Sequence, residues 1–408
     1  MLSAVRTIGA GHLRRQPGYA PLLAAATVAR LANEMFPVAV VLYVLERTGS
    51  EGLAGATVAA LTLPSLVTGP LLGAASDRSL NRVRWLALDQ AVGAASLAAV
   101  TAVLEGGGPE WAVPALVLAA GLTFPLSTGG FTALIPAVVP ASLLGRANAL
   151  EASSFNLAMV GGPALAATVA LGWGTLTAVL VQLGLKLLAL ATCLVLPVSG
   201  GGSQSEDRSL AEVLAGGFRH VLSSRPLLAI TTAGALGMAG RGLLTLAFPL
   251  FAAEALGETQ EAAGYLWSAL AAGAVAGALG FAYLRLPDDD ERVVLAALAV
   301  AGALMLSWPL ANTLAPALAL VCVTGVALGP GLTATFGVRQ RLTPASLHGH
   351  VFMTAASLKV AAFGAGAALA GPAVVQLGAE GTLVLTGALQ LVAAGCGRAL
   401  LRRGAAIR

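Results

Sequence analysis

Several charged residues lie within long apolar stretches of the sequence, where a charge is costly unless it has a partner or reaches water. Arg30 and Glu34 are four positions apart in the first stretch, and Arg241 and Lys359 lie in later ones. Each would cost about 2.5–3.5 kcal/mol at the centre of a helix in a bilayer. A buried carboxyl group beside cations can exchange a proton, because burial favours its neutral form and a cation favours its charged form. The indicated chemistry is proton exchange and binding of charged solutes.

Motifs for bond-making chemistry are absent from the 408 residues. The sequence has no GxxxxGK[ST] loop for ATP, no HExxH zinc helix and no GxSxG turn. Its four histidines and three cysteines have no spacing that predicts a metal site. We therefore expect neither an enzyme nor an ATP-driven pump, with no cofactor and a proton gradient as the energy source.

The composition predicts an all-α membrane protein. Hydrophobic residues make up 57% of the chain and charged residues only 10%, against roughly 25% charged residues in soluble domains. Continuous apolar runs of about 20 residues are typical of transmembrane helices rather than barrel strands. Twelve are predicted, at 19–45, 53–75, 85–104, 111–138, 147–171, 174–197, 227–253, 262–284, 293–311, 313–337, 350–376 and 379–400.

The basic residues predict how the chain crosses the membrane. Of the 23 lysines and arginines, 18 fall in the termini and in alternate loops on one side of the predicted spans, and only Arg47 falls in a loop on the other. The positive-inside rule then places both termini in the cytoplasm. We expect a multi-pass protein of the bacterial cytoplasmic membrane, with the lipid bilayer as a partner. The net charge of +4 follows from this topology and does not indicate a nucleic-acid partner.

The two halves of the chain carry a repeat. The segment Pro-Ala-Ser-Leu that starts at Pro140 recurs at Pro344, which is 204 positions later and half of 408. Matched halves are a common architecture of membrane transporters. The prediction is two pseudo-symmetric six-helix bundles, at 1–197 and 227–408, joined by a cytoplasmic linker at 198–226 that contains a short amphipathic helix.

Two local motifs resemble those of the major facilitator superfamily, and the resemblance covers nearly the whole chain. The loop between spans 2 and 3 has Gly73, Asp77, Arg78 and Arg82 at the positions of that family's cytoplasmic loop motif. Gly162 and Pro163 in span 5 resemble the Gly-Pro motif associated with its exporters, with alanines where glycines are typical. The resemblance implies the two-bundle fold, with helices 1, 4, 7 and 10 around a central cavity, and a bacterial drug or metabolite efflux protein.

Several residues are expected to control conformation. A carboxylate at a helix–loop junction, such as Asp77, can hold one helix pair against another through an arginine or a helix N-terminus. Gly162 and Pro163 form a hinge or a close packing site. Glu151 lies near Arg146 and suggests a gate or salt bridge. Breaks are predicted in spans 4 and 10, from Pro125, Gly129, Gly130 and Pro136 in the first and from Gly329, Pro330 and Gly331 in the second.

The candidate cavity residues include a proton-coupling carboxyl group, Glu34. Arg30 shares a helical face with it, and Arg241 corresponds to Asn33 in the second half. The full set of expected cavity or substrate residues is Arg30, Asn33, Arg241, Lys359, Thr123 and Ser127. A purely structural Arg30–Glu34 pair is the alternative.

The sequence therefore predicts a monomeric secondary active transporter that works by alternating access. We expect a proton-coupled exporter, an antiporter, of small organic molecules such as drugs or secondary metabolites. A proton-symport importer of a small metabolite is one alternative. A non-transporting membrane receptor or scaffold on the same fold is another.

Overall fold

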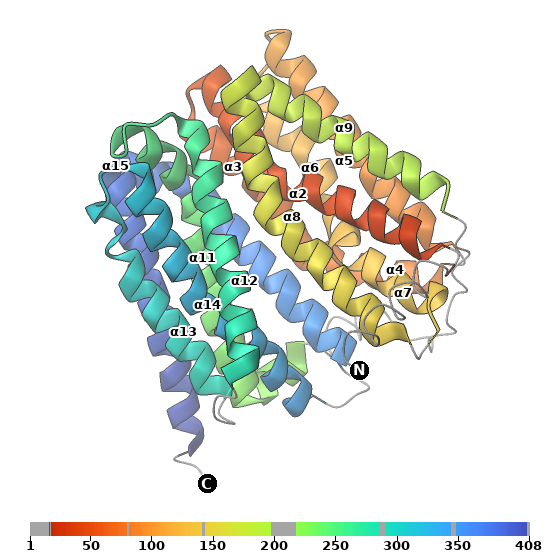
Figure 1. Cartoon of the computed structure of the whole chain (residues 1–408), viewed down its shortest axis with the longest axis vertical. Helices are drawn as coiled ribbons and strands as arrows, with labels where there is room; N and C mark the ends of the chain where they lie inside the picture. The colour runs from red at the N-terminus through yellow and green to blue at the C-terminus, as the bar shows by residue number, and fades with distance from the viewer. Residues whose placement is uncertain are drawn as a thin grey trace, which may run out of the picture.

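The computed structural model of the chain describes residues 16, 18–79, 81–140, 143–196, 218–284, 290–343 and 348–405 (Figure 1). All regular structure in these ranges is helical. The helices in chain order are α2 Tyr19–Thr48, α3 Glu51–Thr62, α4 Ser65–Arg78, α5 Arg82–Glu105, α6 Ala112–Pro125, η1 Leu126–Gly130, α7 Phe131–Val138, α8 Leu144–Trp173, α9 Thr175–Leu194, α11 Arg225–Glu254, η3 Gln260–Ala262, α12 Ala263–Leu284, α13 Asp290–Met305, η4 Trp308–Leu310, α14 Leu314–Leu342 and α15 His348–Ala405.

Ten helices in the described part of the chain are long and apolar enough to cross a membrane, against the twelve predicted. The difference arises in two places. The fourth predicted span is divided among α6, η1 and α7, and the apolar stretch Ala112–Pro125 is short by itself. The last two predicted spans form the single element α15, which is interrupted at Gly378 by a φ of 72°. Glycine adopts a positive φ readily, so Gly378 marks the turn between the two helical segments of α15.

The predicted break in span 4 is confirmed, whereas span 10 stays helical. Residues Leu126–Gly130 form a π-helical turn directly after Pro125. Proline lacks a backbone N–H and disturbs the i to i−4 hydrogen bonds of a helix, and such π turns occur mostly as short insertions. In contrast, α14 continues through Pro330.

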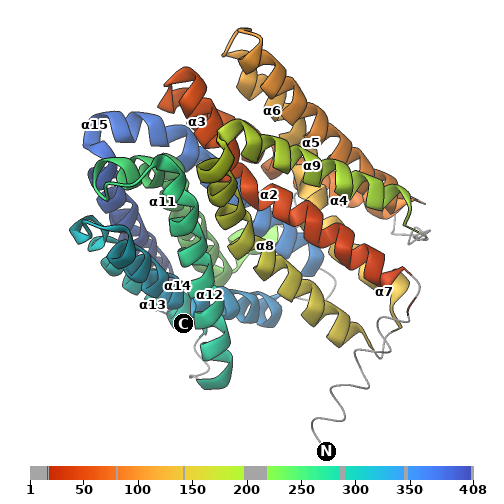
Figure 2. The same cartoon turned by 45° about the horizontal axis from the view of Figure 1, so that its top comes forward.

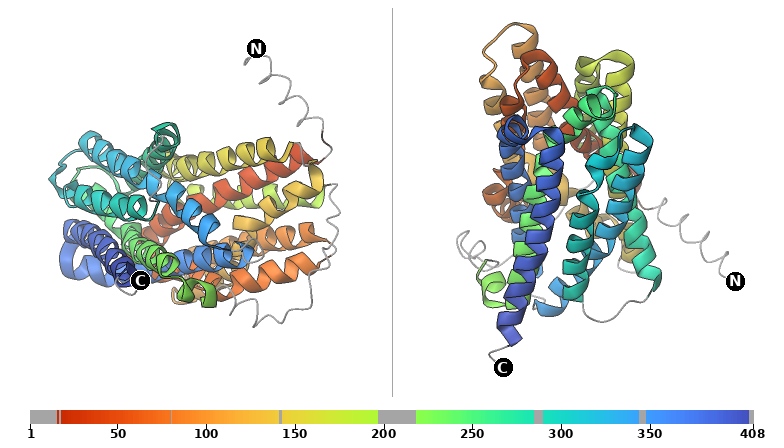
Figure 3. Two further views of the ribbon diagram at one scale, coloured as in Figure 1. Left: turned by 90° about the horizontal axis from the view of Figure 1, so that it is seen from below. Right: turned by 90° about the vertical axis from the view of Figure 1, so that its left-hand side faces the viewer.

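The helices of the first half, α2 to α9, lie beside those of the second half, α11 to α15 (Figures 1 and 3). Two seams join the groups: α15 packs against α3 and α4, and α12 packs against α8 (Figure 2). The predicted linker between the two bundles is 198–226. Its residues 198–217, with most of the predicted amphipathic helix, lie outside the described residues. Residues 218–223 are helical. The division into two domains stays a prediction.

Glycines bring the two halves into backbone contact along both seams. Gly55 of α3 faces α15 so closely that a Cβ atom there would collide with the carbonyl oxygen of Ala367. Gly264 of α12 faces the carbonyl oxygen of Pro163 in the same way. Both approaches lie toward one end of the molecule, because α3 and α12 begin at that end and α2 and α8 finish there. We call this the closed end.

Hydrogen bonds reinforce the seam between α8 and α12 at the closed end. The Ser268 hydroxyl donates to the carbonyl oxygen of Val160 at 2.8 Å. The hydroxyl oxygens of Thr168 and Tyr265 lie 3.2 Å apart. The seam is therefore held by polar contacts as well as by close helix packing.

A pair of buried glutamines shows the internal symmetry of the fold. Gln182 on α9 donates its side-chain amide to the carbonyl oxygen of Ala32 on α2, at 2.8 Å. Gln390 on α15 donates to the carbonyl oxygen of Gly237 on α11, at 2.7 Å. The two glutamines are 208 positions apart. In each half, the last helix is thus tied to the first by the same kind of bond.

Candidate functional site

A cavity of about 480 Å³ lies between helices of both halves. Its walls come from α2, α3, α6 and α8 in the first half and from α11, α12, α13, α14 and α15 in the second. Its charged lining residues are Glu34, Arg241 and Lys359, and Asn33 lies beside them. Four residues that the sequence singled out are therefore brought together in one cavity. A volume of this size is typical of sites for drug-sized molecules.

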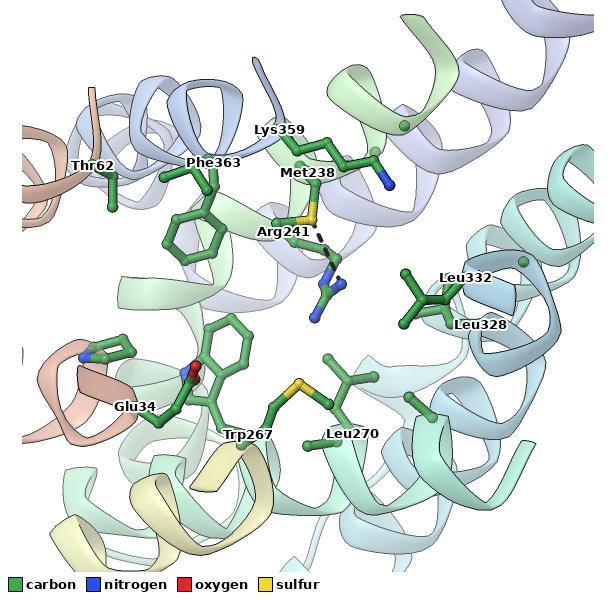
Figure 4. Close-up of a pocket in the computed structure, with 18 of the residues that line it drawn as sticks. Glu34, Thr62, Met238, Arg241, Trp267, Leu270, Leu328, Leu332, Lys359 and Phe363 are labelled. Carbon is green, nitrogen blue, oxygen red and sulfur yellow. Dashed lines mark hydrogen bonds between the residues drawn. The ribbon is translucent and has the colours of Figure 1, made fainter. Parts of the chain in front are cut away.

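The opposite charges come from different sides of the cavity. Figure 4 shows Glu34 extending from α2 on one side, with Arg241 from α11 and Lys359 from α15 on another. Within the described chain, neither cation forms an ion pair with an acidic side chain. Arg241 has a weak contact with the Met238 sulfur atom, 3.6 Å away. The cavity thus keeps a carboxyl group apart from two cations.

Close helix packing positions Glu34. A Cβ atom at Gly162 of α8 would lie 2.5 Å from the Glu34 Cβ, which is too close for any side chain. Gly162 therefore allows α8 to lie directly against the backbone of α2, as expected for a packing site. The next residue, Pro163, lines the cavity. The predicted hinge or packing pair thus lies beside the predicted proton site.

Glycines on α11 make room for the polar groups of α15. A Cβ atom at Gly234 would lie 2.8 Å from the Lys359 Cε, and one at Gly237 would lie 2.7 Å from the Gln390 side-chain oxygen. Both long side chains line the cavity. The pairing of these glycines with Lys359 and Gln390 was not predicted from the sequence. The spacing of three between Gly234 and Gly237 was the one sign of it.

Aromatic rings form much of the apolar lining. The rings are Phe36, Phe124, Phe155, Trp267 and Phe363. The Trp267 ring packs edge-on against Phe248, with 5.2 Å between ring centroids, and also faces Phe363 at 6.3 Å. Few aromatic residues occur in the sequence, so this concentration was not predicted. It arises because helices that are distant in sequence direct their rings into one space.

Buried polar atoms in the lining lack hydrogen-bond partners in the described structure. They are the indole N–H of Trp267, the Nε of Arg241 and the side-chain oxygen of Gln390. The Trp267 side chain is 9% exposed and Gln390 is fully buried. Buried polar groups are normally paired with protein or water. These three atoms are thus buried behind the cavity surface without a partner among the described residues.

Arg30 is not among the lining residues of this cavity, where it was expected, and it does not form the alternative structural pair with Glu34. Its guanidinium group pairs with Glu151 on α8 and donates to the Ser154 hydroxyl at 3.0 Å. It also lies over the Phe155 ring, with its Cζ 5.4 Å from the ring centroid. The spacing of four in α2 placed the two residues near each other, but contacts with α8 decide the direction of the arginine.

Thr123 and Ser127 are also outside the lining of this cavity, contrary to expectation. The Thr123 hydroxyl donates to the carbonyl oxygen of Ala120 at 3.2 Å. Ser127 is buried and donates to Asp89, while the Gln90 amide donates to both Asp89 and Ser127 at 2.8 Å. A buried carboxylate on α5 takes up these hydroxyl and amide donors because it needs hydrogen bonds to remain inside the protein.

Lys186 connects this buried cluster to the cavity. Its ammonium group donates to the side-chain oxygen of Asn33 at 2.6 Å, and Asn33 lines the cavity. The Lys186 side chain is buried, so it does not extend to a membrane surface. Lys186 thus ties α9 to α2.

The predicted control residues are only partly described. Gly73, Asp77 and Arg78 lie in α4, but their side chains are outside the described structure, as is that of Arg146. Arg82 is the first residue of α5. Glu151 was predicted to act in a gate or a salt bridge near Arg146. It forms a salt bridge, and its partner is Arg30.

Comparison with known proteins gives the family. The sequence profile of the Major Facilitator Superfamily matches residues 22–371. The chain belongs to this superfamily, and it is a membrane transporter rather than an enzyme. The resemblance seen in the loop and Gly-Pro motifs is thereby confirmed.

Relatives and solved structures agree with this assignment. The chain is 29% identical over 399 residues to the MFS-type transporter y4rN of Sinorhizobium fredii, covering 95% of this chain and 96% of the relative. It is 29% identical over 374 residues to the multidrug efflux pump Tap of Mycolicibacterium fortuitum, covering 89% and 90%. A crystal structure of the nucleoside transporter NupG superposes with a TM-score of 0.75 at 14% identity, covering 94% and 99%. That likeness shows the shared fold.

Proposed function

We propose that the protein is a proton-coupled exporter of small organic molecules such as drugs or secondary metabolites, working as an antiporter by alternating access. It would lie in the bacterial cytoplasmic membrane as a monomer, with both termini in the cytoplasm. The observation that carries the proposal is Glu34, the one acidic side chain among the described residues that line the cavity. A proton and the substrate's cationic group can compete for this carboxyl group, which couples their movements in opposite directions.

Three further observations support export. Tap, a relative that matches 89% of this chain, is a multidrug efflux pump. The aromatic and apolar lining suits organic molecules rather than simple ions. The backbone contacts between the halves lie at the end where α2 finishes; with both termini in the cytoplasm, as proposed, that closed end would face outward and the cavity would receive molecules from the cell interior.

The test is proton-driven uptake into inside-out membrane vesicles, using a panel of labelled organic compounds that includes the fluoroquinolone norfloxacin. An acid interior should drive accumulation, and an ionophore that removes the gradient should abolish it. Glu34→Gln should still bind substrate but should lose the response to the gradient. Unchanged coupling in Glu34→Gln would remove Glu34 from this role.

The same vesicles distinguish the alternatives. A proton-symport importer would accumulate its substrate in right-side-out vesicles when the external medium is acidic. A receptor or scaffold would bind a compound without accumulating it in either orientation. Arg47→Gln, which alters an exposed residue far from the lining, is the matched control for effects of substitution on expression.

A further inference from the structure

Resting on the proposed function, the geometry points to the substrate class: an amphoteric aromatic molecule that carries a basic nitrogen at one end and an anionic oxygen group at the other. We infer that Glu34 receives the basic nitrogen, while Arg241 and Lys359 receive the anionic group. The aromatic body would lie against the rings between them.

The lining of the cavity carries more positive than negative charge. Two cations and one carboxyl group face the cavity; Glu34 is an electrostatic neighbour of Arg241, but in the described structure neither cation forms an ion pair with an acidic side chain. Arg339 is an electrostatic neighbour of Lys359 and adds positive charge on that side. A cation buried without a counter-charge is expensive. One carboxyl group cannot balance two cations, so an anionic group of the substrate would neutralise the excess positive charge.

The negative and positive charges of the lining lie on different sides of the cavity. Glu34 and Arg241 line the same cavity from different helices without forming an ion pair (Figure 4). A purely anionic substrate would satisfy Arg241 and Lys359 but would be repelled by the ionised Glu34. A purely cationic substrate would satisfy Glu34 but would be repelled by the two cations. A molecule with both groups at opposite ends satisfies both sides.

The rest of the cavity lining is largely apolar and aromatic. Trp267 and Phe363 present ring faces or edges to the cavity, and aromatic pairs add to the stability from apolar burial. Phe36, Phe124 and Phe155 add further rings to the same lining. A flat aromatic body with polar substituents fits this lining better than an aliphatic chain does.

An amphoteric substrate also agrees with antiport. If its basic nitrogen binds the Glu34 carboxylate, a proton that binds Glu34 displaces it. If the substrate were only anionic, protonation of Glu34 would strengthen its binding, and proton and substrate would then be expected to move together. The charge pattern of the substrate is therefore linked to the direction of coupling.

The experiment uses four charge forms of one fluorescent scaffold. Norfloxacin has a basic piperazine nitrogen and a carboxylate at opposite ends of an aromatic bicycle. Its carboxamide lacks the negative charge, its N-formyl derivative lacks the positive charge, and the N-formyl carboxamide lacks both. Dissociation constants are measured by fluorescence on the purified full-length protein in lipid nanodiscs.

The wild-type protein should bind norfloxacin at least about tenfold more tightly than either singly charged form, as charge-assisted hydrogen bonds imply. Arg241→Gln and Lys359→Met should each remove most of the preference for norfloxacin over the carboxamide. Glu34→Gln should remove the preference over the N-formyl derivative. The ratio of two dissociation constants is unaffected by a partial loss of folded protein, and Arg47→Gln should leave both ratios unchanged.

The inference is overturned if the carboxamide binds as tightly as norfloxacin, if norfloxacin does not bind, or if the ratios survive in Arg241→Gln and Lys359→Met. These results are distinguishable from failure of the proposed function. Proton-driven accumulation of the carboxamide without a preference for norfloxacin would overturn the substrate class and leave antiport standing. Charge-selective binding without any proton-driven accumulation would overturn antiport and leave the substrate class standing.

Discussion

Replacement of Arg30 by glutamine should destabilise the protein strongly. The Arg30 side chain is 3% exposed and its partner Glu151 is 12% exposed, so the variant leaves a carboxylate buried without its cation. Removing one partner of a buried pair costs about 3–5 kcal/mol, which is about a 100- to 4000-fold change in the unfolding equilibrium constant. The matched control is Arg47→Gln, because Arg47 pairs with Glu105 at a site where both side chains are more than a third exposed. That substitution should cost at most about 1 kcal/mol.

Equilibrium unfolding of the purified variants in mixed micelles, followed by tryptophan fluorescence, measures both losses. The double variant Arg30→Gln with Glu151→Gln should recover part of the loss, because the carboxylate is then removed as well. Similar small losses for Arg30→Gln and Arg47→Gln would refute the reasoning, since they would show that Glu151 reaches water as easily as Glu105.

The remaining predictions concern the packing around the cavity. Gly162→Ala should push α8 away from Glu34 and weaken proton coupling in vesicle uptake, with substrate binding affected less; uptake with the wild-type response to the gradient would contradict this. Gly234→Ala should displace the Lys359 side chain and weaken norfloxacin binding to the purified protein, whereas an unchanged dissociation constant would count against the proposed place of that lysine. Lys186→Met should lower the free energy of unfolding by about 1–3 kcal/mol, because it leaves the Asn33 oxygen without its donor; unfolding in micelles measures the loss, and a wild-type value would show that this bond is unimportant.

The sequence was sufficient for the fold class and for the charged residues of the cavity. Charges are so expensive in apolar helices that Glu34, Arg241 and Lys359 stand out without any coordinates. The direction of a side chain around its helix was less predictable. Arg30 lies one turn from Glu34, yet Glu151, which is 121 positions away, decides its orientation. Such a contact depends on how α2 and α8 cross, and nothing in the local pattern fixes that crossing.

Hydroxyl and aromatic residues were harder to place than charges. Ser127 looked suitable for a cavity, but a buried carboxylate on a neighbouring helix uses its hydroxyl. The aromatic lining was missed because Phe36, Trp267 and Phe363 are far apart in the chain and do not form a local motif. Their shared location follows from helix packing, to which glycines such as Gly234 contribute by leaving space rather than by making contacts.

The glycine contacts at the closed end have a consequence for the speed of the transport cycle. Where Gly55 meets α15 and Gly264 meets α8, main chain rests on main chain. At these two glycines no side chain interlocks, so separating the helices there requires no rotamer change, although the hydrogen bonds of the α8–α12 seam must break. A backbone contact of this kind can separate and re-form many times without rearranging interlocked side chains. Bulky residues at these positions would therefore slow turnover even if they left the resting structure intact.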